Sequence, residues 1–214
     1  MKKPENRNVF VNCPFDENYR DCFEALIFTI AASGYRVKCA LEDGDGARVR
    51  LDKLVSLITA SDRSVHDLSW ATVPEGDPAR YNMPFELGLM VGSKSWGGVR
   101  QRRKTTLVLV EKKHGLAPYL SDLAGVDPQE HRFDPNLIIQ KVRGYLHHYP
   151  SGGLLPGVRH YRDLLDEFKT DLPEILTSAR LSVDEADPIS SYRNYIDLLT
   201  GFLEIVEGIA QPKG

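Results

Sequence analysis

Apolar residues in the first 150 positions of the chain follow two different spacings. Short runs rich in β-branched and aromatic residues predict strands, and these runs lie at 8–15, 35–41, 64–68, 105–110 and, more briefly, 130–133. Between them, apolar residues recur every three or four positions, which predicts helices at 19–33, 49–60, 83–93, 116–123 and 137–148. Strands and helices therefore alternate along this part of the chain.

Such an alternation predicts a parallel sheet with helices on both faces, because a parallel neighbour is reached only through a crossover connection. Right-handed crossovers make the sheet doubly wound. The run at 105–110 (TTLVLV) supports this prediction, because it is apolar almost throughout, as a strand covered on both faces requires. We expect an α/β fold with about five parallel strands.

A change in composition divides the chain near residue 150. Ser151-Gly152-Gly153, flanked by Pro150 and Pro156, has the composition of a linker. We therefore expect an α/β domain over residues 1–149 and a helical C-terminal extension over residues 150–214.

The extension has helical spacing in two segments, 158–179 and 189–209. Pro173 should break or kink the first segment. The apolar stripe of the second must pack on the main domain or on a second subunit.

In the main domain, Gly34 is suited to end one helix and Asn82 to cap another.

The charge balance gives little reason to expect nucleic acid or an anionic membrane as the partner. The chain has 214 residues and a formal net charge of -3. The basic cluster Arg100-Gln101-Arg102-Arg103-Lys104 lies between predicted elements, and a solvated loop is favoured over a phosphate or nucleic-acid patch. No apolar run approaches 18 residues, so no membrane span is expected.

Three cysteines, Cys13, Cys22 and Cys39, have neither CxxC nor zinc-finger spacing. Buried, reduced thiols are the favoured interpretation. The opening residues MKKPENRN lead into a strand without an apolar signal segment. We expect a cytoplasmic protein without a metal site.

Ligands of open parallel sheets bind at the carboxyl ends of the strands. Four stretches are predicted to gather there: 14–17, 42–50, 67–70 and 82–86. Glu86 is the most unusual residue among them, because the window PFELGLMVG around it contains no other charge. A carboxyl group in such a setting should be partly buried, with a raised pKa. The alternative is a glutamate that caps the helix or pairs with an arginine such as Arg80.

Three neighbouring positions have two interpretations each. Gly88 is unfavourable within a helix, and either a close ligand or backbone or tight helix–sheet packing would explain it. Asp67 ends a strand, where it could bind a ribose hydroxyl or cap the next loop. His66 points to the opposite face of that strand and is favoured as a core histidine over a ligand-binding one.

Common catalytic signatures are missing from the sequence. There is no GxxxxGK phosphate loop, no GxGxxG after the first strand and no GxSxG elbow. His147 and His148 adjoin without a third metal ligand nearby. The loop residues Asp43, Asp45 and Arg48 are a weak signal for a ligand.

Three segments together resemble a known superfamily. VFVNCPFD, ASDRSVHDLSW and NMPFELGLMVG look like the superfamily that joins nucleoside 2-deoxyribosyltransferases with TIR-type domains, and more narrowly like bacterial TIR-like nucleotide-binding proteins. The resemblance covers residues 8–145 and implies a flavodoxin-like fold. The Phe85-Glu86-Leu87-Gly88 segment matches the one that carries the nucleophilic glutamate in the transferases. Their Asp-x-Gly is replaced here by Arg80-Tyr81-Asn82.

The resemblance implies that Glu86 attacks or stabilises a ribosyl centre while an N-glycosidic bond is cleaved. It also implies candidate substrate-binding residues: Phe15, Asp16, Asp62, Asp67, Trp70, Arg80 and Asn82. The aspartates would hold ribose hydroxyls, and Phe15 or Trp70 would stack on a base. No cofactor is required, and NAD or another nucleotide would be the substrate or ligand.

Three functions remain open at this point. The first is an enzyme, a nucleosidase, ribosyltransferase or NAD-cleaving hydrolase that uses Glu86. The second is a non-catalytic nucleotide sensor or TIR-like assembly module, in which the C-terminal helices relay a signal or form a homo-oligomer. The third is an interaction protein in which Glu86 is merely paired.

Overall fold

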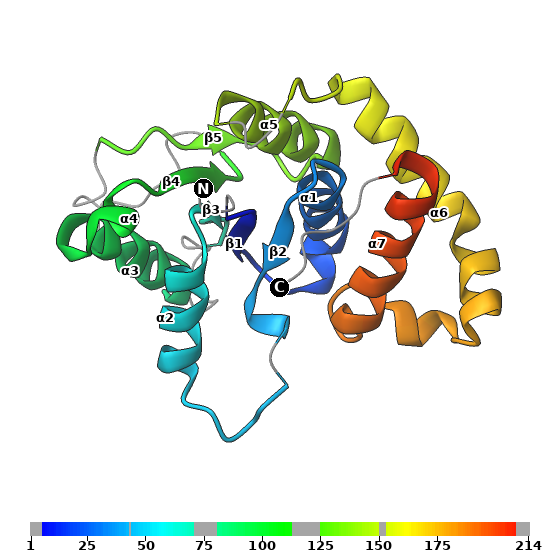
Figure 1. Ribbon diagram of the computed structural model, residues 1–214, viewed down its shortest axis with the longest axis horizontal. Helices are drawn as coiled ribbons and strands as arrows, with labels where there is room; N and C mark the ends of the chain where they lie inside the picture. The colour runs from blue at the N-terminus through cyan, green and yellow to red at the C-terminus, as the bar shows by residue number, and fades with distance from the viewer. Residues whose placement is uncertain (1–5, 43, 71–80, 113–124, 150–152, 209–214) are drawn as a thin grey trace, which may run out of the picture.

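Five parallel strands form one sheet in the order β2-β1-β3-β4-β5 (Figure 1). The computed structural model describes residues 6–42, 44–70, 81–112, 125–149 and 153–208. The strands are β1 (Asn8–Asn12), β2 (Arg36–Lys38), β3 (Arg63–Asp67), β4 (Thr105–Val110) and β5 (Gln129–Glu130). Each neighbouring pair is parallel. The predicted α/β fold is confirmed, and its strand order is that of flavodoxin-like sheets.

Helices cover both faces of the sheet (Figure 1). One face carries α1 (Arg20–Ala32) and α5 (Pro135–His148), which pack against each other. The other face carries α2 (Arg50–Ala60), α3 (Asn82–Trp96) and the short α4 (Val99–Arg102). Among the described residues, short 3₁₀ helices connect elements at η1 (Glu17–Tyr19), η2 (Ala40–Glu42) and η4 (Val183–Ala186).

Alternating residues of β1 show why this strand is apolar on both sides. Val9 and Val11 belong to the large core beneath α1 and α5. Phe10, between them, packs with Leu54 of α2 and Met90 of α3 on the other face. Successive side chains of a strand point to opposite faces, so a sheet covered on both sides needs apolar residues at consecutive positions.

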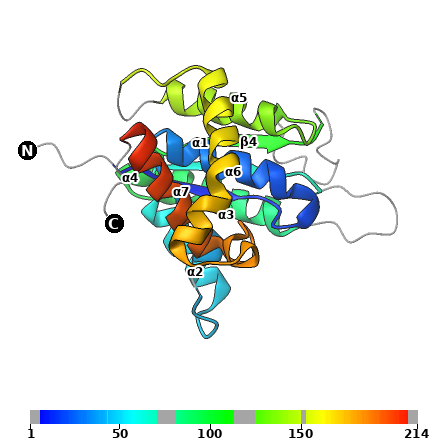
Figure 2. The ribbon, with the colours of Figure 1, turned by 90° about the vertical axis from the view of Figure 1, so that its right-hand side faces the viewer.

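The C-terminal helices α6 (Val158–Ala179) and α7 (Tyr192–Glu207) form an outer layer over α1 (Figures 1 and 2). Phe168 of α6 and Phe202 of α7 belong to the same apolar core as Phe28 of α1, and the Phe168 and Phe28 rings lie 6.4 Å apart. The apolar stripe of the extension therefore packs on the main domain, which was one of the two predicted alternatives.

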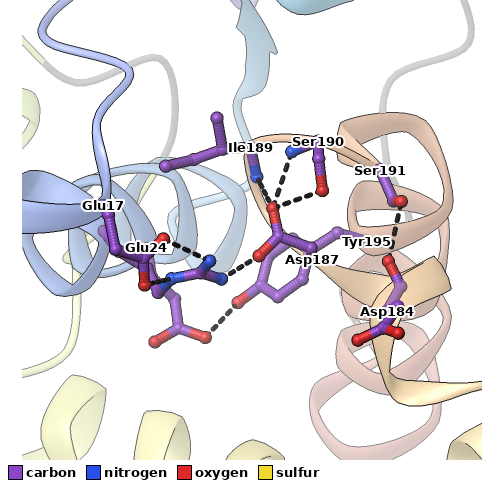
Figure 3. A network of polar contacts seen from close by, with 9 residues as sticks. Glu17, Glu24, Asp184, Asp187, Ile189, Ser190, Ser191 and Tyr195 are labelled. Carbon is purple, nitrogen blue, oxygen red and sulfur yellow. Dashed lines mark hydrogen bonds and ion pairs between the residues drawn. The ribbon is translucent and has the colours of Figure 1, made fainter.

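A polar network joins the same elements at one end of the layer (Figure 3). Arg20, at the start of α1, donates from Nε to Oε1 of Glu17 at 2.7 Å and pairs through Nη1 with Asp187 of the extension. The buried hydroxyl of Tyr195 donates to Oε1 of Glu24 at 2.8 Å. These contacts fix α7 relative to α1.

The predicted helix ends are confirmed in part. Gly34 ends α1 with a left-handed φ of 75°, as predicted. Asn82 was predicted to cap α3, but it is the first helical residue, with Tyr81 at the cap position and no side-chain cap bond. Pro173 was predicted to break or kink its segment, and the break is wrong because α6 continues as one helix on both sides of this residue. The short helix predicted over 116–123 lies outside the described residues.

The three cysteines are free and buried, as predicted. Burial is the main reason why the pKa of each thiol lies above its ordinary value. No helix in the described parts of the chain has the length and apolarity to cross a membrane.

Candidate functional site

The carboxyl ends of β1 and β3 meet where the strand order reverses. From β1 the chain runs to β2 on one side, whereas β3, β4 and β5 follow on the other side. In open parallel sheets, ligand crevices form at such a switch point. Residues 13–16 follow β1 there and residues 68–70 follow β3, so two of the predicted stretches lie side by side.

Asn12 connects the end of β1 to the start of α3. Its buried Nδ2 donates to the carbonyl oxygen of Met83 at 3.0 Å and lies 3.1 Å from Nδ1 of His66. Because Nδ1 accepts this bond, the neutral His66 ring carries its proton on Nε2, which has no partner in the described structure. Burial lowers the pKa of His66 to about 3. The predicted core histidine is therefore confirmed as buried, but only one of its nitrogens is bonded.

Glu86 lies one turn further along α3, in a mainly apolar setting. The residue is only 4% exposed, and its helical neighbours Met83, Leu87 and Met90 are buried. Burial raises the pKa of Glu86 to about 7, and the charge of Arg50 limits this rise. The predicted buried carboxyl group with a raised pKa is confirmed. At neutral pH both of its protonation states are populated, which suits acid–base or nucleophilic chemistry.

Arg50 is the cation that faces Glu86. It is the first residue of α2, and its Nη2 lies 3.7 Å from Oε1 of Glu86. This distance is too long for a hydrogen bond, so Arg50 acts mainly as a nearby charge. The Arg50 side chain is 68% exposed. The partner suggested by the sequence was Arg80, which lies outside the described residues.

Arg50 also lines a pocket of about 260 Å³ between η2 and the start of α2. The lining residues are Ala40, Gly44, Asp45, Gly46, Arg48, Arg50, Lys53 and Leu54. Three cations face one carboxylate there, and the helix N-terminus adds positive partial charge. This combination suits an anionic group such as a phosphate. Asp45 and Arg48, two of the three loop residues that were a weak signal in the sequence, therefore help to form a positively charged pocket, whereas Asp43 lies outside the described residues.

Asp67 is the second carboxylate at this edge, and it is fully buried. Its Oδ2 accepts hydrogen bonds from the hydroxyl of Tyr19 and from Nε2 of His131, the latter at 3.0 Å. Its Oδ1 accepts from the backbone N–H of Ser69 at 2.8 Å. Burial alone would raise the pKa of Asp67, but these bonds and the His131 ring outweigh it, so the pKa lies below its ordinary value.

Ser69, His131 and Asp67 do not form a nucleophilic triad, although all three are in contact. Nε2 of His131 faces both Asp67 and the Ser69 hydroxyl at 3.0 Å, and its Nδ1 accepts from the backbone N–H of Phe133 at 3.1 Å. A triad needs the carboxylate on one ring nitrogen and the hydroxyl on the other. The group instead joins η1, β3 and the end of β5.

Aromatic rings and strained backbone cover this buried group. Trp70 lies 5.1 Å from the Phe133 ring and 6.0 Å from the Tyr19 ring. Trp70, Arg132 and Phe133 have left-handed φ values of 60°, 55° and 54°. Such conformations are costly for residues other than glycine and cluster at functional sites. Three of the four non-glycine residues with left-handed φ in the described chain therefore lie at the predicted ligand edge, and the fourth, Arg180, ends α6.

The structure brings together only part of the predicted site. Phe15, Asp16 and Trp70 lie at the switch point, and Phe15 contacts Phe23 of α1 edge to face at 5.3 Å. Asn82 is exposed at the start of α3. Asp62 immediately precedes β3, at the amino-terminal ends of the strands, where it pairs with Arg100 at 2.7 Å. Glu86 lies near the carboxyl ends of the strands, and β3, with five residues, spans about 16 Å. Asp62 is therefore not a neighbour of Glu86.

Gly88 was expected to mark a close approach to the sheet, a backbone or a ligand. Tight packing on the sheet is wrong, because Gly88 is exposed and no atom lies within 4 Å of the position that its Cβ would occupy.

For Asp67, the expected cap of the following loop is present as the bond from the Ser69 N–H.

Several important contacts were not predicted, although Arg50 ends one of the four stretches expected at the ligand end of the sheet. Arg50 and Asn12 hold or face the α3 segment, and Tyr19 and His131 hold Asp67. Arg50 lies 36 positions before Glu86, so no local spacing points to the pair. His131 directly follows β5, but its partner Asp67 lies 64 positions earlier, so no local pattern predicts this contact either.

In the described ranges, no group of three or more histidine, cysteine, aspartate or glutamate side chains could hold a metal ion. The chain matches no family model, no curated protein and no solved structure.

Proposed function

We propose that the chain binds a nucleotide-type ligand at the carboxyl edge of the sheet and cleaves its N-glycosidic bond through Glu86. The observation that carries this proposal is the position of Arg50. This arginine faces the buried Glu86 carboxyl group at 3.7 Å and also lines the positively charged pocket at the start of α2. An anion-binding pocket thus adjoins a carboxyl group whose pKa is about 7.

The ligand class follows from the chemistry of these neighbours. The pocket of about 260 Å³, with Arg48, Arg50 and Lys53, suits phosphate oxygens. The aromatic side chains of Phe15 and Trp70, at the ends of the adjacent strands, suit a planar base. A sugar that joins a phosphate to a base is then the part of the ligand that reaches Glu86. NAD and nucleoside phosphates combine all three features.

The reaction requires an ionised Glu86. As the bond from the anomeric carbon to the base nitrogen breaks, its electron pair leaves with the base, and positive charge develops on the sugar. The Glu86 carboxylate either bonds to the anomeric carbon or stabilises this charge. Water then adds to the anomeric carbon and releases the ribosyl product, and its proton is lost to solvent or to the departing base. Burial of Glu86 strengthens the electrostatic stabilisation.

A nucleotide sensor without turnover is the alternative, and one observation favours it. Of the three aspartates proposed to hold ribose hydroxyls, Asp67 is fully buried and Asp62 lies at the opposite edge of the sheet. Only Asp16 remains partly exposed near the switch point. A sensor would show a ligand-induced rise in melting temperature without release of base.

The test is incubation of the protein with NAD, nucleosides and nucleoside monophosphates, followed by chromatography of the free bases. We expect the wild type to release base from at least one phosphate-containing substrate, and Glu86→Gln to release none. Glu204→Gln changes an exposed glutamate of α7 and serves as the matched control. Equal base release by the wild type and Glu86→Gln would contradict the proposal. A melting shift without any base release would favour the sensor.

A further inference from the structure

Two exposed surfaces at opposite ends of the molecule are both partly apolar and carry opposite charge. The first is a groove of about 640 Å³ between α6 and α7. Its lining residues are Asp171, Glu174, Ile175, Ser178, Ala179, Asp197, Leu198, Gly201, Phe202, Ile205 and Val206. The groove is thus mostly apolar, with three carboxylates and no lysine or arginine. We call it the acidic groove.

The apolar floor of the acidic groove is incompletely covered. Ile205 is 86% exposed and Val206 is 41% exposed, although both belong to the last turns of α7. Among the described residues, Asp197 pairs with Arg193 at 3.4 Å, whereas no ion pair involves Asp171 or Glu174. Exposed apolar area with an acidic margin is typical of a surface that binds a cationic, apolar partner.

The second surface is formed by the end of α3 and by α4. Trp96 is 88% exposed and Val99 is 68% exposed, and the exposed Arg102 and Arg103 follow them. No aspartate or glutamate occurs between Glu86 and Glu111 in the sequence. We call Trp96, Val99, Arg102 and Arg103 the basic knob.

The body of the protein holds the basic knob in place. Arg100 donates from Nε to Oδ1 of Asp62 at 2.7 Å, and Gln101 donates to the carbonyl oxygen of Thr59 at 3.4 Å. The Trp96 ring lies over Gly92, where an added Cβ would approach the ring to 3.1 Å. A presented tryptophan flanked by arginines has the composition of an interface anchor, and its ordering costs little on binding.

We propose that the basic knob of one molecule docks into the acidic groove of a second copy of this chain. The two surfaces lie at opposite ends of the molecule in Figure 1, and Figure 2, which faces α6 and α7, places α4 behind them. The basic knob of a molecule therefore cannot reach the acidic groove of the same molecule. Contact between two grooves would bring carboxylates together, and contact between two knobs would bring arginines together, so like charges disfavour both symmetric arrangements.

This contact is head-to-tail, because each copy uses two different surfaces. Such interfaces produce rings when the rotation closes and open filaments when it does not. Exposed charges contribute to the contact, so its strength should fall as salt is added.

Sedimentation velocity over a concentration series, at low and high salt, tests the proposal with two variants. The knob variant is Trp96→Ser with Arg103→Gln, and the groove variant is Asp171→Lys with Glu174→Lys. All four positions are exposed, so both variants should fold. Val183→Ser, at a residue that is 76% exposed outside both surfaces, is the control.

We expect the wild type and the control to self-associate, more strongly at low salt, and each variant alone to remain monomeric. An equimolar mixture of the two variants should form a one-to-one dimer and nothing larger, because only one functional knob and one functional groove remain. A wild type that stays monomeric at every concentration would overturn the proposal and leave the groove to a basic segment of another protein. Self-association that survives in either variant, or a mixture that does not dimerise, would overturn it as well.

Discussion

Nη2 of Arg50 lies 3.7 Å from Oε1 of Glu86, and this ion pair joins the N-terminus of α2 to the buried carboxyl group of α3. Burial raises the pKa of Glu86 to about 7, and the charge of Arg50 holds it below a still higher value. Arg50 therefore couples the anion pocket to the protonation state of Glu86.

Replacement of Arg50 by glutamine should raise the pKa of Glu86 above about 7, because the opposing charge is lost while burial remains. NMR titration of the glutamate side-chain carboxyl carbons checks this expectation. Arg48→Gln is the matched control, because Arg48 lines the same pocket but bonds to Ser56 at 2.7 Å. An unchanged Glu86 titration in Arg50→Gln would show that the pair does not interact.

The stability of the protein should depend on pH through two groups with opposite signs. The pKa of His66 falls from 6.5 to about 3 in the folded protein. Its contribution is therefore fully present above pH 6.5 and is lost as the pH falls from there toward 3. The pKa of Glu86 rises from 4.5 to about 7. Its contribution is therefore present below pH 4.5 and is lost as the pH rises from there to about 7.

Between about pH 4.5 and 6.5, the contributions of His66 and Glu86 to the free energy of unfolding change in opposite directions with pH. Glu86→Gln should therefore expose the His66 contribution, and the free energy of unfolding should fall by about 2 kcal/mol from pH 7 to pH 5. Urea denaturation at a series of pH values measures this slope. His66→Phe should show the reverse trend, with the free energy of unfolding falling as the pH rises. Identical slopes in the wild type and both variants would contradict the burial of these two groups.

Asp67→Asn should lower the free energy of unfolding by about 3 kcal/mol, because a buried and bonded charge becomes a mismatched amide. Its partners Tyr19, His131 and Ser69 stay in place and lose a charged acceptor. Asp163→Asn removes an exposed carboxylate that pairs with Arg159 at 3.5 Å, and it should cost less than about 1 kcal/mol. Equal losses in these two variants, measured by urea denaturation, would show that the buried network contributes little.

Asn12→Leu should both destabilise the fold and alter Glu86. The substitution leaves the Met83 carbonyl oxygen and Nδ1 of His66 without their donor, which should cost about 2 kcal/mol. Because Asn12 holds the first turn of α3, the NMR titration of Glu86 should shift as well. Asn8→Leu is the control at the other end of β1, where the amide bonds to the Ala60 carbonyl oxygen at an exposed position. A loss of stability without a shift in the Glu86 titration would restrict Asn12 to a structural role.

Much of the fold could be predicted because burial imposes a spacing on the sequence. The strand at 105–110 has the predicted bounds, since a strand covered on both faces must be apolar throughout. The break predicted at Pro173 is absent because tertiary packing outweighs local propensity. Phe168 and Leu176 on either side of it are buried, so both halves of α6 are held in one helix.

The candidate site was only partly predictable, because its contacts join distant positions. The burial of Glu86 could be predicted from its apolar neighbours on the same helix. Its partner Arg50 and the contact between Asp67 and His131 depend on how α2 and β5 pack, and no local spacing contains that information. Asp62 was placed at the site by resemblance, whereas its position before β3 puts it at the opposite edge of the sheet.

The rate of base release as a function of pH tests the central role of Glu86 most directly. With the phosphate-containing substrate that the wild type cleaves best, kcat/KM should rise with pH and level off above about 7, as the Glu86 carboxyl group ionises. Glu86→Gln should release no base at any pH, while Glu204→Gln should follow the wild-type curve. Base release by Glu86→Gln at the wild-type rate, or no release by the wild type at any pH, would contradict the account.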